Sequence, residues 1–91
     1  MTLPTIHLNG SSQESLVHDA RTAYSALLDA AAALSRMHPH QRDYYPAPDT
    51  WDAATAEHAA RIKAVQGVMD SVSEWALAVQ NLNPEDRASA L

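Results

Sequence analysis

The chain has 91 residues, no cysteine and a formal net charge of −5, which predicts one small domain without a disulfide or a cysteine-based zinc site. The negative charge argues against broad nucleic-acid binding, because that binding relies on dense Lys and Arg side chains. No apolar run is long enough to span a bilayer and no basic leader precedes one, so we expect a cytoplasmic protein that is neither secreted nor inserted in a membrane.

Residues 1–10 are expected to form a short extended arm. Ile6 and Leu8 alternate with polar residues, and Asn9-Gly10 is a turn signal. An arm of this length cannot form a sheet alone. It either lies along a helical surface or pairs with the arm of a second copy, and the sequence leaves both alternatives open.

The first long helix is predicted over residues 12–38. Ser11 and Glu14 have the spacing of a capping box, in which the serine accepts from the amide three residues on and the glutamate reaches back. Pro39 ends the helix. Its main apolar seam alternates steps of four and three, and a second stripe flanks it. The seam is Leu16, Ala20, Ala23, Leu27, Ala30, Leu34 and Met37, and the flanking stripe is Val17, Tyr24, Leu28 and Ala31.

A loop over residues 39–49 leads to a second helix over 50–82, for which Asp49 or Thr50 is the expected cap. Gly67 in its middle predicts a close packing contact, since glycine is unfavourable inside a helix. Asn83 and Pro84 open a predicted short helix over 84–90. The main seam is Trp51, Thr55, His58, Ile62, Val65, Met69, Val72, Ala76 and Val79, and the flanking stripe is Ala54, Arg61, Val68, Trp75 and Leu82.

These elements predict an all-α fold, an antiparallel hairpin of two long helices with a short N-terminal arm and a short C-terminal helix. One seam on each helix suffices for the hairpin itself. The flanking stripes therefore predict self-association into an oligomeric helical bundle. A helix of a different protein would bury the same stripes, so a homo-oligomer and a foreign partner both remain open.

The candidate site lies where the loop meets the second helix, because a hairpin brings these segments to one end. Polar residues at core-spaced positions need partners when they are buried. In one alternative they only tie the loop down, through a pair between Asp43 and Arg61 and a bond from a tyrosine to His58. In the other, the arginines face an anionic ligand and a tyrosine stacks on its planar ring. The candidate ligand-binding residues are Arg42, Asp43, Tyr44, Tyr45, His58 and Arg61.

Other chemistry is not expected. His38 and His40 flank a proline and lack the spacing of zinc motifs. Glu57 and His58 are adjacent on a helix and point about 100° apart, so they cannot act as an acid/base pair. Neither a nucleophile elbow nor a phosphate-binding loop is present. We therefore predict a protein that is not an enzyme and that uses no metal or cofactor.

Three segments carry a resemblance to a known group of proteins. They are Ile6-His7-Leu8-Asn9-Gly10-Ser11, Arg42-Asp43-Tyr44-Tyr45-Pro46, and Ala54 with Glu57-His58 and Arg61. Together they resemble small, mostly uncharacterised helical proteins of tailed bacteriophages and prophages, over about residues 6–75. Ser11 stands where that group often has threonine.

The resemblance implies a phage accessory protein in the host bacterial cytoplasm. Small helical phage proteins include oligomeric sponges that bind host cyclic-nucleotide immune signals without cleaving them. By this analogy we expect sequestration of a small anionic ligand, such as a cyclic or ADP-ribose-type nucleotide, in an anti-defence role. The alternative is an interaction module that docks a host or phage protein through its apolar helix stripes.

Overall fold

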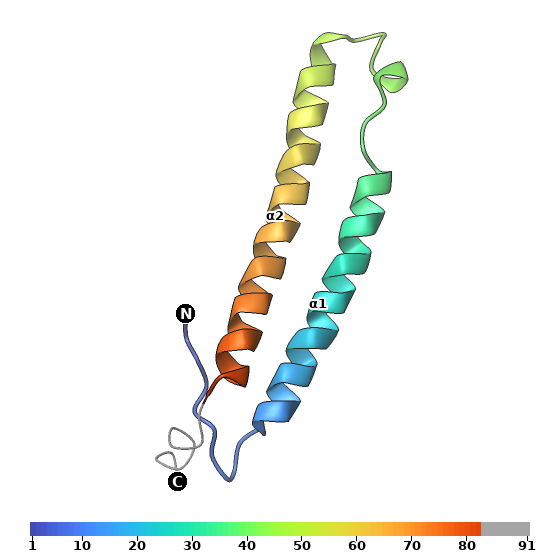
Figure 1. The fold of residues 1–91 in the computed structure, drawn as a ribbon. Coiled ribbons are helices and arrows are strands. Elements are labelled where there is room, and N and C mark those ends of the chain that lie inside the picture. The colour runs from blue at the N-terminus through green and yellow to red at the C-terminus, as the bar shows by residue number, and fades with distance from the viewer. Residues whose placement is uncertain (83–91) are drawn as a thin grey trace.

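The structure, a computed structural model, describes residues 1–82, which form a hairpin of two antiparallel helices (Figure 1). Helix α1 spans Gln13–Arg36, and α2 spans Asp49–Gln80. A short 3₁₀ helix, η1 (Gln41–Asp43), lies in the loop between them. Residues 1–82 contain no strand. The predicted all-α hairpin is confirmed, whereas the predicted helix over 84–90 lies outside the described residues.

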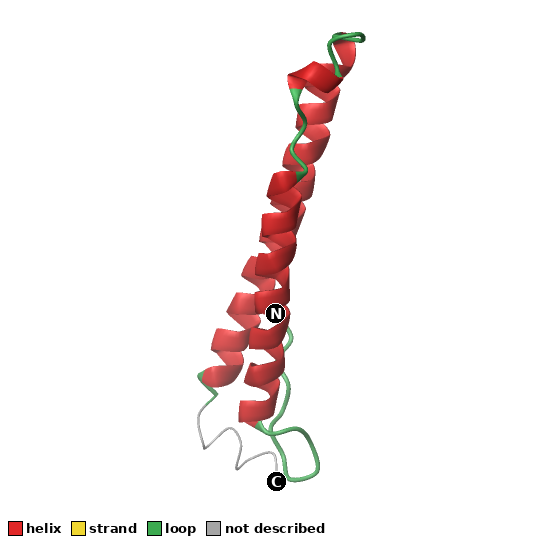
Figure 2. Ribbon diagram, turned by 90° about the vertical axis from the view of Figure 1, so that its right-hand side faces the viewer, coloured by secondary structure: helices red, strands yellow, loops and turns green. Residues whose placement is uncertain are grey.

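The hairpin is a single layer of two helices. Viewed edge-on in Figure 2, α1 and α2 lie one in front of the other, and residues 1–82 contain no third α-helix. The molecule measures 66 × 20 × 18 Å, and its radius of gyration is 19.8 Å. A compact domain of this length would have a radius of gyration of about 12 Å. No helix in the described part is both long and apolar enough to cross a membrane.

Helix α1 begins one residue later than predicted. Ser12 is the N-cap, and its hydroxyl accepts a hydrogen bond from the amide of Ser15 at 3.0 Å. The capping box based on Ser11 is therefore wrong. Glu14 lies in the first turn instead, where its charge favours the positive end of the helix dipole. The helix ends at Arg36, close to the predicted end before Pro39.

Helix α2 begins without a side-chain cap. Its N-cap is Pro48, and the hydroxyl of Thr50 donates to the carbonyl of Ala47 at 2.7 Å rather than accepting from the helix. The prediction that Asp49 or Thr50 caps the helix is therefore wrong. Asp49 and Asp52 lie in the first turn, so their charges still stabilise this helix end.

The two helices meet along the predicted seam of α2 but along a rotated seam of α1. Every residue of the α2 seam is buried or half-buried, as predicted. On α1, Ala23 and Ala30 are exposed, while Tyr24 and Ala31 are half-buried. This rotation of α1 about its own axis turns Tyr24 rather than Ala23 toward α2. It therefore removes more apolar area from water.

Burial of apolar side chains is confined to one end of the hairpin. Within residues 1–82 the buried apolar side chains are Val17, Ala20 and Val79, and only Val79 is fully buried. They lie where α1 begins and α2 ends. In the middle of the hairpin the seam residues remain half-exposed. Two helices alone therefore leave the core incomplete over most of its length.

The side chain of Gln13 links the start of α1 to the end of α2 by hydrogen bonds. Its Nε2 atom lies 2.7 Å from the carbonyl oxygen of Val79 and 3.1 Å from those of Gln80 and Leu82. The last carbonyls of a helix have no partner within the helix. The amide of Gln13, at the start of α1, therefore donates to carbonyls at the end of α2.

The N-terminal arm contains the predicted turn, where the amide of Gly10 donates to the carbonyl of His7 at 3.1 Å. The arm runs beside the last turns of α2 (Figure 1). Ile6 is half-buried, in line with an arm on a helical surface, but Leu8 is 85% exposed and does not lie on one. Pairing of Ile6 and Leu8 with a second copy stays a prediction.

Gly67 is not packed within the hairpin. A Cβ atom added there meets nothing within 4 Å. The predicted close contact at this glycine is therefore wrong for residues 1–82.

Candidate functional site

The loop end is built from consecutive turns. The amide of Tyr44 donates to the carbonyl of Gln41, that of Ala47 to Tyr44, and that of Thr50 to Ala47, each at 3.0 Å. These bonds carry the chain from η1 directly into α2. They leave Tyr44 half-buried and Tyr45 on the outside, where it is 74% exposed.

An aromatic hollow forms at this end. The rings of Tyr44 and Trp51 have centroids 5.9 Å apart and are tilted by 57°. The hollow has a volume of about 330 Å³, and its lining residues are Gln41, Tyr44, Tyr45, Pro48 and Trp51. Such a surface offers ring faces for stacking and one amide for hydrogen bonding.

The structure does not bring the predicted site residues together. Arg42 and Asp43 are exposed on η1 and do not line the hollow. Arg61 follows the start of α2 by twelve residues, or about 18 Å along the helix. Its guanidinium lies 4.0 Å from the carboxylate of Glu57 on the same exposed helix face. Within residues 1–82, Arg42 and Arg61 therefore do not form a shared cationic pocket at the loop end.

Unequal helix lengths explain this separation. Helix α2 has 32 residues and α1 has 24, so the first turns of α2 extend past the end of α1. The loop packs on those first turns through Tyr44 and Trp51. It does not fold back toward His58 and Arg61.

His58 is the one buried polar residue of the described chain, at 9% exposure. Neither the predicted bond from a tyrosine nor the predicted pair between Asp43 and Arg61 is present among residues 1–82. No buried side-chain nitrogen or oxygen there lacks a partner, so the His58 ring nitrogens reach solvent. The prediction that these particular pairs hold the loop against α2 is therefore wrong.

The rings of the two loop histidines lie close together in a tilted arrangement. The rings of His38 and His40 have centroids 4.5 Å apart and are tilted by 55°, and Nδ1 of His38 donates to the carbonyl of Ser35 at 3.0 Å. Within residues 1–82, no three His, Cys, Asp or Glu side chains are grouped so that they could hold a metal ion.

Charge at the loop end is negative. Asp43, Asp49 and Asp52 lie in this segment against the single guanidinium of Arg42, and all four are exposed. These three carboxylates and one guanidinium give the side chains around the aromatic hollow a net negative charge, which disfavours anions.

Two apolar grooves lie on opposite sides of the line along which α1 and α2 touch, and Ala20 and Val72 line both. We name them the Tyr24 groove and the Trp75 groove. The first, of about 280 Å³, is lined by Val17, Ala20, Arg21, Tyr24, Ser25, Leu28, Val72, Ser73, Ala76, Leu77 and Gln80. The second, of about 380 Å³, is lined by Leu16, Asp19, Ala20, Ala23, Ser71, Val72 and Trp75.

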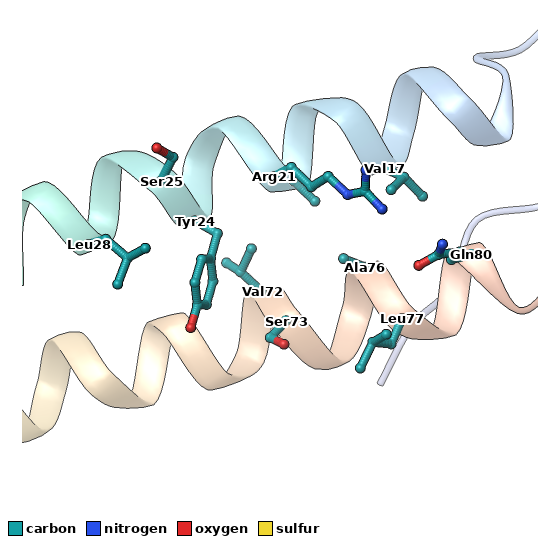
Figure 3. Close-up of a pocket in the computed structure, with 11 residues that line it drawn as sticks. Val17, Arg21, Tyr24, Ser25, Leu28, Val72, Ser73, Ala76, Leu77 and Gln80 are labelled. Atoms are coloured by element: carbon teal, nitrogen blue, oxygen red, sulfur yellow. The ribbon is translucent and has the colours of Figure 1, made fainter.

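Leucines edge the Tyr24 groove. Figure 3 shows Tyr24 reaching from α1 across to α2, with Leu28 to one side of it. Leu28 and Leu77 are 50% and 57% exposed. The flanking stripes of the sequence indicated surplus apolar surface, but the sequence did not divide it into two grooves.

Comparison of the chain with protein-family models, with curated proteins and with solved structures finds no match.

Proposed function

We propose that this chain is a non-enzymatic helical interaction module that associates with further copies of itself. One observation carries the proposal: within residues 1–82 only Val17, Ala20 and Val79 are buried apolar residues. A stable domain must bury enough apolar surface to offset the conformational entropy lost on folding. Further helices packed on the hairpin would supply the missing burial.

Sedimentation equilibrium tests the proposal, because it reports mass independently of shape and the hairpin is strongly elongated. At micromolar concentration we expect a species at a multiple of 9.9 kDa, with the helical circular dichroism spectrum of a folded hairpin. A single helical species near 9.9 kDa would refute self-association. If that monomer bound a host or phage protein instead, the foreign-partner alternative would replace it.

A second candidate function is sequestration of a nucleotide-like ligand at the loop end. The observation that favours it is the aromatic hollow beside the exposed ring of Tyr45. Aromatic faces stack on any nucleobase. Because the surrounding charge is negative, binding of an anionic nucleotide would need cationic groups from a second copy. The hollow supports stacking on the base more directly than recognition of phosphate.

Variants at Tyr45 test this candidate by calorimetry with a cyclic dinucleotide and an uncharged nucleoside as probes. Tyr45→Ala is expected to weaken binding by about 1 to 3 kcal/mol through lost stacking, while Tyr45→Phe retains the ring and binds as the wild type does. Tyr45 is largely exposed, so neither change should alter the melting temperature. If neither probe binds the wild type, the sequestration role is excluded.

A further inference from the structure

Two stripes with a seven-residue period, apolar except at Arg61, lie on the same side of the hairpin. Each period of seven is about two helical turns, so the members of one stripe share one face. Leu16 and Ala23 of the first stripe and Trp75 of the second all line the Trp75 groove. The stripes are Leu16, Ala23, Ala30 and Met37 on α1, and Ala54, Arg61, Val68, Trp75 and Leu82 on α2.

The side chains along this face are exposed or half-exposed in the hairpin. Val68 is 51% exposed and Met37 is 60% exposed, and Ala23 and Ala30 are also exposed. Apolar residues repeat every seven positions along both helices, except at Arg61 of α2, which pairs with Glu57. Such a repeat is typical of a helix that packs against another helix. Residues 1–82 provide no such helix on this side.

The two stripes differ in size in a complementary way. The α1 stripe is small at its centre, with Ala23 and Ala30. The α2 stripe carries Val68 and Trp75 at the same levels along the hairpin, since Trp75 lines one groove with Ala23 and Val68 lies one heptad nearer the loop. Bulky side chains of one helix fit between small residues of a facing helix.

We name the side of the hairpin that carries these two stripes the Trp75 face. We infer that the Trp75 face binds a second copy of this chain, with a two-fold axis parallel to the helices. This axis sets α2 of each copy against α1 of the other. Trp75 then lies over the partner helix between positions 16 and 23, and Val68 lies between positions 23 and 30. The result is a four-helix bundle in which neighbouring helices are antiparallel.

A second copy fits better than a foreign helix because the face is complementary to itself. The rotation matches the bulky stripe with the small stripe twice, once on each side of the axis. An isologous contact of this kind closes at two copies. This inference rests on the proposed self-association and specifies the surface through which the copies bind.

A pair of matched variants tests which face is used. Val68 and Leu28 are equally exposed, at 51% and 50%, but lie on the Trp75 face and in the Tyr24 groove, respectively. Val68→Lys is expected to raise the dimer dissociation constant roughly a hundredfold or more, because it buries an unpaired charge in the contact. Leu28→Lys should change it by less than about threefold. Ala30→Lys, on the facing stripe, should act like Val68→Lys.

Sedimentation equilibrium of the full chain reads out each variant, with circular dichroism as the check on folding. If the wild type is monomeric, self-association itself fails. If the wild type associates but Leu28→Lys dissociates it while Val68→Lys and Ala30→Lys do not, self-association stands and the inference about the Trp75 face is overturned.

The direction of the axis is tested with a single spin label. The chain has no cysteine, so Ala53→Cys introduces one labelling site near the loop end of α2. A parallel axis places both labels at the same end of the bundle, on the order of 20 Å apart, or about two helix diameters. Labels separated by most of the length of α2, which has 32 residues and is about 48 Å long, would show opposed copies and would overturn the parallel axis.

Discussion

Val79→Ala is expected to lower the free energy of unfolding by about 2 to 3 kcal/mol. Val79 is the only fully buried side chain of residues 1–82. Removing two methyl groups loses their transfer free energy and leaves a cavity that the surrounding helices fill only in part. Urea denaturation at a fixed protein concentration measures the loss, since association makes apparent stability depend on concentration.

Leu77→Ala is the matched control for Val79→Ala. It lies two residues away on α2 and removes more carbon atoms, but Leu77 is 57% exposed. We expect it to cost less than Val79→Ala. Equal losses would mean that the Tyr24 groove is covered in solution, and a greater loss for Leu77→Ala would place the main core there.

Gln13→Ala is expected to lower the free energy of unfolding by about 1 to 3 kcal/mol. The amide of Gln13 donates to carbonyls at the end of α2, of which those of Val79 and Leu82 are partly buried. The Val79 carbonyl keeps its hydrogen bond from the amide of Leu82, at 3.2 Å. The variant removes the Gln13 donor from the partly buried contact with the Leu82 carbonyl, and leaving a partly buried acceptor without its donor lowers stability by an amount in this range. Thermal or urea melts measure the effect, and Ser15→Ala, in the same exposed first turn, is the control that should change little.

Gln13→Glu separates the hydrogen bond from side-chain packing. The carboxylate matches the amide in size but cannot donate, and the facing carbonyls disfavour its charge, so its folded-state pKa should lie above the unfolded value of about 4.3. The loss should therefore be present at neutral pH and should shrink as the pH falls through that raised pKa, because the protonated acid donates again. The loss from Gln13→Ala should not change over this range. A pH-independent loss in Gln13→Glu would contradict the hydrogen-bond role.

The seam of α2 could be predicted from the sequence because it depends on periodicity alone. Apolar residues at alternating steps of four and three must lie on one face of a helix, and all of the residues from Trp51 to Val79 that were assigned to the seam are buried or half-buried. The helix ends were also predicted to within two residues. The end of α1 could be predicted because Pro39 stops the helix for steric reasons that no packing can override.

The rotation of α1 could not be predicted in the same way. Its apolar residues form two adjacent stripes, and either could face α2. The choice depends on the total area buried when Tyr24 rather than Ala23 turns inward, which is a property of the packed pair. The capping serine was misplaced for a similar reason, because Ser11 and Ser12 are both competent caps and the packed helix uses the second.

The sequence by itself determined an all-α hairpin with more apolar surface than its own seam can bury, because helical periodicity and proline sterics are local properties. Only the tertiary structure decided which side chains meet at the loop end. The predicted cluster required Arg42, His58 and Arg61 to lie at one level. Helix α2 instead extends past α1, so Tyr44 packs on Trp51 and Arg61 lies about 18 Å down the helix. Relative helix length and loop path are set by contacts between distant residues, and no local pattern encodes them.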